Sequence, residues 1–135
     1  MNIVYNNVLS VEDYCKLRKS VGWRDISEAR VQYALDKSDF IIAAVVDSNA
    51  VGMARLITDG TQVLIMDVVV HPDYQGKGIG RGLMEQIRQY ILSIDFDQIL
   101  VNLITRDQTG FYEKLGYKKL KDFQAEGMRL WLNGM

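Results

Sequence analysis

Residues 66–83 read M-D-V-V-V-H-P-D-Y-Q-G-K-G-I-G-R-G-L, and this stretch joins three local patterns. Its first residues continue an apolar run rich in β-branched side chains, which predicts a strand. His71-Pro72 ends that strand, because proline cannot donate to a sheet ladder. A glycine-rich segment follows at 75–80, and apolar residues at helical spacing begin at Ile79. A strand that passes through a glycine turn into a helix N-terminus favours phosphate binding, because the first helical amides lack intrahelical partners and carry positive potential.

Three kinds of phosphate loop share this description, and the spacing of the glycines separates them. A P-loop requires Ser or Thr after its Gly-Lys pair, whereas Lys77 is followed by Gly78. A dinucleotide fingerprint, G-x-G-x-x-G, would start at Gly76 or Gly78. It would then require a third glycine where Arg81 or Leu83 stands. Both of these interpretations therefore fail.

The third pattern, Q/R-x-x-G-x-G/A, fits Gln75, Gly78 and Gly80. It is the acyl-CoA pyrophosphate signature of the GNAT acetyltransferase superfamily, which this sequence resembles. The preceding strand, which ends in V-x-V-H-P at 68–72, adds to the resemblance.

A second motif lies about 25 residues further along the chain, where residues 105–108, T-R-D-Q, form a potential capping box. Residues 111–117, F-Y-E-K-L-G-Y, predict a short helix closed by a left-handed Gly116. They resemble the second GNAT signature, whose tyrosine lies beside the thioester sulfur; here that residue is Tyr112. Many GNAT members carry Asn seven residues before this tyrosine, in contact with CoA. Thr105 stands at that position, which makes it a candidate cofactor contact.

The order of expected elements predicts one α/β domain over residues 1–135. Ser10 and Ser27 are candidate N-caps of two helices, and Gly22 is expected to end the first. Strands are expected at 3–5, 40–46, 51–57, 62–70, 98–103 and 127–132. These elements favour a mixed, mostly antiparallel central sheet flanked by helices. The GNAT resemblance implies that two parallel strands splay apart at the acyl-CoA site.

Composition and charge argue against several other classes. The 135 residues are 48% hydrophobic with a formal net charge of −1, so no basic field favours nucleic acid or an anionic membrane. A lone cysteine, Cys15, excludes an internal disulfide and favours a reducing compartment. No apolar run approaches the ~20 residues of a membrane span, and the first residues do not read as a signal peptide. We therefore expect a cytoplasmic protein without membrane or nucleic-acid partners.

The GNAT resemblance implies acetyl transfer from acetyl-CoA to an amine, with no metal. Backbone amides of the strand before the loop would polarise the thioester carbonyl as an oxyanion hole. The leaving thiolate would take a proton or a hydrogen bond from Tyr112. A base, either Asp67 or water, must deprotonate the amine, whose pKa as an alkyl ammonium is about 10. The expected cofactor contacts are Val68, Val69, Val70, Gln75, Gly76, Lys77, Gly78, Ile79, Gly80, Arg81, Thr105 and Tyr112.

Several of these residues also have structural interpretations. Asp67 is either a general base, a solvent-facing strand residue or a hydrogen-bond anchor. Arg55, within an apolar strand, either binds a carboxylate of the acceptor or pairs with Asp67. Trp23 is either an acceptor-side wall, as the resemblance implies, or a core residue. Tyr112 has a core alternative too, and His71 is best explained as a strand terminator.

The resulting hypothesis is an N-acetyltransferase in which a primary amine attacks acetyl-CoA directly in a ternary complex. The acceptor, whether a small molecule or a peptide, is not specified by the sequence. The alternative is a non-catalytic acyl-CoA-binding or sensory domain on the same fold, and a nucleotide-binding regulatory protein ranks third. The family often dimerises, so the resemblance includes a homodimer among the expected states.

Overall fold

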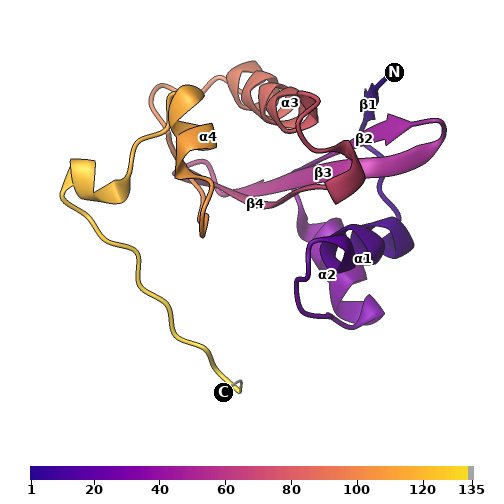
Figure 1. Cartoon of the computed structure of the whole chain (residues 1–135). Helices are drawn as coiled ribbons and strands as arrows, with labels where there is room; N and C mark the ends of the chain where they lie inside the picture. The colour runs from indigo at the N-terminus through magenta and orange to yellow at the C-terminus, as the bar shows by residue number, and fades with distance from the viewer. Residues whose placement is uncertain (134–135) are drawn as a thin grey trace. The chain divides into compact units, whose positions relative to one another are not determined.

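The computed structural model describes residues 1–133, which divide into two compact units, residues 1–103 and residues 104–133. Figure 1 shows the chain coloured from its N-terminus to its C-terminus.

The first unit contains a five-stranded sheet in the order β1-β2-β3-β4-β5. Its strands are β1 (Val4–Asn6), β2 (Phe40–Val46), β3 (Asn49–Thr58), β4 (Gln62–Val70) and β5 (Leu100–Asn102). Its helices are α1 (Val11–Ser20), α2 (Glu28–Lys37), the 3-10 turn η1 (Pro72–Tyr74) and α3 (Ile79–Ser93). All neighbouring strands are antiparallel except β4 and β5, which are parallel. The predicted mixed, mostly antiparallel sheet is thus confirmed.

Helices cover both faces of this sheet, with α1 and α2 on one side and α3 on the other (Figure 1). On the α1 side, Tyr14 and Leu17 pack with Met53 and Val69 of the sheet. On the α3 side, the Phe40 ring stacks on Tyr90 with their centroids 4.3 Å apart.

Local capping explains where the first two helices begin, as the sequence predicted. The Ser10 hydroxyl accepts a hydrogen bond from the Asp13 amide at 3.0 Å, and the Ser27 hydroxyl accepts one from Arg30. After α1, Gly22 has φ +77° and its amide donates to the Lys19 carbonyl. This left-handed glycine satisfies a terminal carbonyl and ends the helix.

The second unit contains α4 (Thr109–Lys114) and the 3-10 turn η2 (Leu120–Phe123). Gly116 follows α4 with φ +99°, and the Tyr117 amide donates to the Tyr112 carbonyl at 3.1 Å. The predicted left-handed closure of this short helix is therefore confirmed.

The strand predicted at 127–132 is wrong. This segment is extended chain without ladder pairing in the described structure, and its apolar side chains are exposed, Met128 by 97%. Residues M-R-L-W-L alternate as a strand does, but alternation produces a strand only where a neighbouring backbone completes the hydrogen bonds. The other strand boundaries differ from the predictions by two residues or fewer.

Candidate functional site

The candidate site of the first unit is built on β4, whose two halves have different neighbours. Residues 62–64 of β4 pair with β5 in parallel, and this pairing stops at Leu64–Asn102. Residues 65–70 continue along β3 alone, so one edge of this half has no strand partner among the described residues. This geometry confirms that the two parallel strands separate, and it leaves backbone groups of β4 available to a ligand.

A β-bulge interrupts β4 between Met66 and Val69, within the part of the strand that pairs with β3 alone. Arg55 lies opposite Met66, but Met53 lies opposite Val69, so Ala54 faces both Asp67 and Val68. Asp67 has φ +56°, in the left-handed region that Asp tolerates better than most residues.

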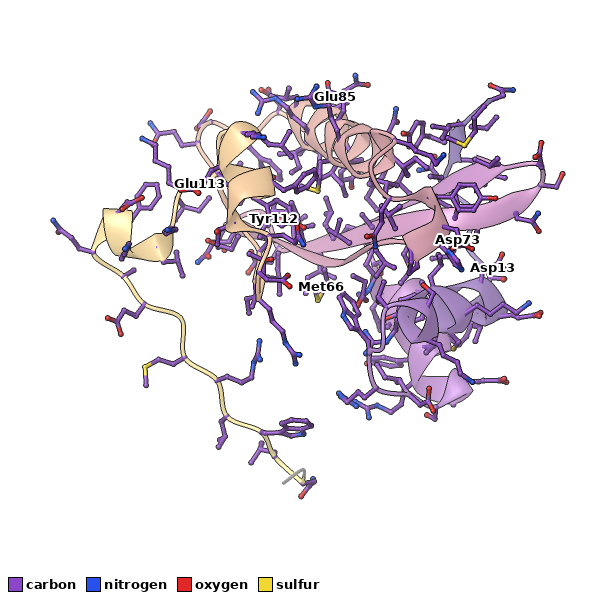
Figure 2. The ribbon with its side chains drawn as sticks, in the orientation of Figure 1. Asp13, Met66, Asp73, Glu85, Tyr112 and Glu113 are labelled. Carbon is purple, nitrogen blue, oxygen red and sulfur yellow. The ribbon has the colours of Figure 1, made fainter. Side chains whose placement is uncertain are left out.

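The bulge changes the face of the sheet that each following side chain reaches. Simple alternation from Met66, which projects away from α3 (Figure 2), would direct Asp67 toward α3. Instead Asp67 reaches the α1 side, and Val69 packs there with Tyr14. The extra residue thus brings a carboxylate to the α1 side of the sheet.

Three donors hold the Asp67 carboxylate. The Tyr14 hydroxyl donates to Oδ2 at 2.5 Å, and Arg55 Nε donates to the same oxygen at 2.7 Å. Arg18 Nη1 donates to Oδ1 at 3.0 Å. The Asp67 side chain is 10% exposed, so this is a nearly buried ion-pair cluster.

Of the interpretations left open for Arg55, the structure contains the pairing with Asp67. Its remaining guanidinium nitrogens donate to Ser38 Oγ at 3.3 Å and to Met66 Sδ at 3.7 Å. All three nitrogens of Arg55 therefore have partners within the first unit. For Asp67, the geometry is that of a hydrogen-bond anchor.

Trp23 lies beside this cluster without being a core residue. The residue is 39% exposed, and the Arg18 guanidinium carbon lies 5.1 Å from the centroid of its ring. Arg18 Nη2 also donates to the Arg24 carbonyl at 3.2 Å. Arg18 therefore connects Asp67 to the loop between α1 and α2. That loop and the two helices also line a cavity of about 200 Å³, bordered by Cys15, Arg18, Arg24, Asp25, Ile26, Glu28 and Val31.

The glycine-rich loop after β4 has the geometry of an anion site. Gly76 and Gly78 have φ +77° and +83°, which side-chain-bearing residues rarely adopt. Gly78 is the N-cap of α3 without a side-chain cap, and the first intrahelical bond runs from Gly82 to Gly78. The amides of residues 79–81 therefore precede the hydrogen-bonded helix and are the orphan donors that attract phosphate.

Side chains around this loop divide into anchors and exposed charges. The Gln75 amide group donates to the Val70 carbonyl at 2.9 Å and so ties the loop to the end of β4. The His71 ring accepts from the Asp73 amide at 3.1 Å, which starts η1. Lys77 and Arg81 are exposed and add positive charge near the orphan amides.

In the second unit, Tyr112 is 9% exposed and lies edge-on to Phe111 and Tyr117. Burial, together with neighbouring Tyr117, raises the pKa of Tyr112 to about 12. The hydroxyl therefore remains protonated throughout the neutral range. Thr105 Oγ1 accepts from the Gln108 amide at 3.1 Å, one half of the predicted capping box.

Two residues of the cluster, Tyr14 and Arg18, were not among the predicted site residues. Tyr14 lies on the apolar face of α1, where a buried tyrosine hydroxyl usually requires a partner. Arg18 follows it by four residues and so lies on the same face of α1. An arginine on an apolar helical face was the available signal. Their partner lies about 50 residues away in the sequence, which no local pattern indicates.

Comparisons with known proteins agree with this geometry. The model of the acetyltransferase (GNAT) domain matches residues 36–119. The uncharacterised N-acetyltransferase ycf52 of Pyropia yezoensis is 35% identical over 121 residues, covering 86% of this chain and 67% of that protein. A crystal structure of a protein of unknown function from meticillin-resistant Staphylococcus aureus, described as a probable acetyltransferase, superposes with a TM-score of 0.86 and 28% identity. That match covers 96% of this chain and 98% of the other. A GNAT family acetyltransferase from Streptococcus pneumoniae TIGR4 gives a TM-score of 0.78 with 29% identity, over 98% and 97% of the two chains.

This chain belongs to the GNAT acetyltransferase family. The activity that the family supports is acetyl transfer, and the fold is one that generally uses acetyl-CoA. Across residues 1–133 no group of three or more His, Cys, Asp or Glu side chains could hold a metal ion. In the same residues no helix is both long enough and apolar enough to cross a bilayer.

Proposed function

We propose that this protein is an N-acetyltransferase that transfers the acetyl group of acetyl-CoA to a primary amine by direct attack in a ternary complex. The observation that carries the proposal is the continuity of one structural segment. Residues 65–70 of β4, which pair with β3 alone, lead through a left-handed glycine turn to the orphan amides of α3. That segment offers hydrogen-bond donors for a pyrophosphate beside a strand edge along which a pantetheine arm can lie.

In this proposal the cofactor contacts are those that the sequence predicted. The amides of residues 79–81 bind the pyrophosphate, and the exposed charges of Lys77 and Arg81 supplement them. Gln75 acts by holding the loop against Val70. The backbone of Val68–Val70 supplies the donors that stabilise the developing oxyanion.

We assign the leaving-group interaction to Tyr112, with Thr105 at the start of that motif. A thiol has a pKa of roughly 8.5, whereas the pKa of Tyr112 is about 12. A phenol with the higher pKa keeps its proton, so Tyr112 stabilises the departing thiolate chiefly as a hydrogen-bond donor. The resemblance of F-Y-E-K-L-G-Y to the second GNAT signature supports this role.

We assign deprotonation of the amine to water. Both oxygens of Asp67 already accept hydrogen bonds, one of them from two donors. An incoming ammonium would have to displace an arginine or Tyr14 to reach the carboxylate. A water chain requires no such rearrangement.

The test is a thiol-release assay with acetyl-CoA and a panel of amines that includes free amino acids, aromatic amines and peptides. We expect amine-dependent CoA release for at least one acceptor, with the acetylated amine identified by mass spectrometry. Saturable acetyl-CoA binding without thiol release for any amine would instead indicate the non-catalytic acyl-CoA-binding alternative.

A further inference from the structure

The bulge of β4 requires support that its own strand pairing does not supply. The left-handed region of backbone conformation is unfavourable for residues other than glycine, and Asp67 occupies that region. From Asp67 onward, β4 pairs with β3 on one side and has no strand partner on the other side among the described residues. The conformation of residues 67–70 therefore depends on contacts made by side chains.

Those contacts come chiefly from α1. Tyr14 and Arg18 lie one helical turn apart and reach the Asp67 carboxylate from the same helix face, binding different oxygens. Arg55 binds the carboxylate from β3, the strand that already pairs with β4. Two donors from α1 thus hold the carboxylate on the α1 side of the sheet, against the direction that simple alternation would give.

Burial and hydrogen bonding suit Tyr14 to a permanent contact. The residue is 2% exposed, and burial together with the Asp67 carboxylate raises the pKa of Tyr14 to about 12. The hydroxyl therefore donates to Asp67 throughout the neutral range.

Arg18 also makes a second set of contacts away from Asp67. It donates to the Arg24 carbonyl and lies against the Trp23 ring, in the loop between α1 and α2. Within the described residues, its Nε is a buried nitrogen without a hydrogen-bond partner. Arg18 therefore contacts both the Asp67 carboxylate and the loop that follows α1.

We propose that Tyr14 and Arg18 are positioning residues for acetyl transfer. They hold Asp67 so that the bulge keeps the amides of residues 68–70 in place, and Arg18 also fixes the loop that carries Trp23 and Arg24. This inference rests on the proposed function, in which those amides act as the oxyanion hole. Tyr14 then affects the chemical step alone, whereas Arg18 affects both the chemical step and binding of the acceptor.

The experiment compares Tyr14→Phe and Arg18→Lys in steady-state kinetics with the best amine of the panel. Tyr14→Phe removes one hydroxyl, and we expect kcat to fall about tenfold with an unchanged acceptor KM, as small displacements of catalytic groups do. Arg18→Lys keeps the charge but cannot bind Asp67 and Arg24 together. We expect a similar loss of kcat and an acceptor KM raised about fivefold.

The control is Leu35→Val, a change in the same apolar cluster that touches none of the hydrogen bonds to Asp67. We expect a lower Tm with kcat within twofold of the parent. A kcat loss in this variant as large as that of Tyr14→Phe would overturn the proposal, since general destabilisation would then explain both. Arg18→Lys with an unchanged acceptor KM would overturn the connection to the loop.

A double-variant cycle tests whether Tyr14 acts through Asp67. Because Asp67→Ala removes the acceptor of the Tyr14 hydroxyl, we expect the variant with both Tyr14→Phe and Asp67→Ala to have a kcat within twofold of Asp67→Ala alone. If the fold losses in kcat of the two single variants instead multiply in the double variant, the result would contradict the proposal.

Amide hydrogen exchange distinguishes failure of this inference from failure of the proposed function, because it requires no activity. We expect faster exchange in the peptide covering residues 67–70 of Tyr14→Phe, with α3 unchanged. Faster exchange in a protein without amine-dependent thiol release would retain the positioning role and reject the enzyme. Unchanged exchange would overturn the positioning role whatever the activity.

Discussion

The two halves of β4 differ in what determines their conformation. In residues 62–66 the side chains alternate regularly between the two faces of the sheet. Residues 63–66 pair with β3, and residues 62–64 pair with β5. In residues 67–70 the strand is bulged, has one neighbouring strand and depends on side chains of α1. The regular half follows from a local periodic pattern, whereas the bulged half requires contacts between residues about 50 positions apart. The half that departs from regular geometry is also the one that leads into the glycine-rich loop.

The largest expected effect is on CoA affinity, and it comes from a change in the glycine-rich loop that follows the bulged half of β4. Gly80→Val places a branched side chain among the orphan amides of α3 and keeps a pyrophosphate from the backbone. We expect CoA affinity to fall by about 100-fold or more, the loss of one or two charge-assisted hydrogen bonds. Isothermal calorimetry on the folded variant measures this.

The matched control is Arg88→Val, an exposed position of the same helix. It introduces the same β-branched side chain with little effect expected on CoA affinity. Equal affinities for Gly80→Val and the parent would show that the pyrophosphate binds elsewhere.

The next largest effect tests whether departure of the thiolate is assisted by Tyr112 of the second unit. Tyr112→Phe keeps the ring and removes the hydroxyl. We expect kcat to fall about 10²-fold, the value of a hydrogen bond to a charged group, with acetyl-CoA affinity little changed. A rate within twofold of the parent would assign Tyr112 to the core.

The pH dependence of this effect follows from the raised pKa of Tyr112. Because the hydroxyl loses its proton only near pH 12, the ratio of parent to Tyr112→Phe rates stays constant from pH 7 to pH 10. A ratio that declines toward 1 below pH 10 would contradict the assignment.

A third change removes the side-chain contact that β3 makes to the bulged half of β4. Arg55→Met removes the Nε contact to Asp67 but leaves the donors of Tyr14 and Arg18. We expect a loss of about 2 kcal/mol in the free energy of unfolding, below the usual cost of breaking a buried pair, because Asp67 stays partnered. Urea unfolding measures the loss. An acceptor KM that rises while stability is unchanged would restore the alternative in which Arg55 binds the acceptor.

The smallest expected effect is on stability, and it compares backbone strain in the two halves of β4. Asp67→Ala and Asp67→Gly both remove the carboxylate, but only alanine is strained at φ +56°. We expect the alanine variant to be about 1 kcal/mol less stable than the glycine variant. At Met66, in the regular half, the order reverses, because glycine weakens a strand interior. The same order at both positions would show that the bulge carries no backbone strain of this kind.

Much of the fold could be predicted because its signals are local. Ser10, Ser27, Gly22 and Gly116 begin or end helices through contacts within a few residues, and the structure confirms each. The strand at 127–132 could not be judged in this way. Its alternation matches a strand, but pairing depends on a partner outside the segment, and the described structure contains none for it.

The candidate site likewise has parts that local sequence signals predicted and parts that they did not. The resemblance of Gln75, Gly78 and Gly80, with the strand before them and the second motif at 111–117, predicted a family that the comparisons show. These signals are local, because a turn that binds phosphate needs glycines at set positions within one short segment. The face of the sheet that Asp67 reaches was beyond such reasoning, and the sequence left the pairing of Arg55 with Asp67 as one of two alternatives.

The sequence by itself determined the family, the glycine loop, the helix starts and the mostly antiparallel sheet, since each depends on residues close together in the chain. The tertiary structure alone decided that Asp67 turns toward α1, that Tyr14 and Arg18 hold it, and that Arg55 is paired. A bulge shifts register by one residue, and each side chain beyond it changes face. Only packing between distant segments selects which register is stable.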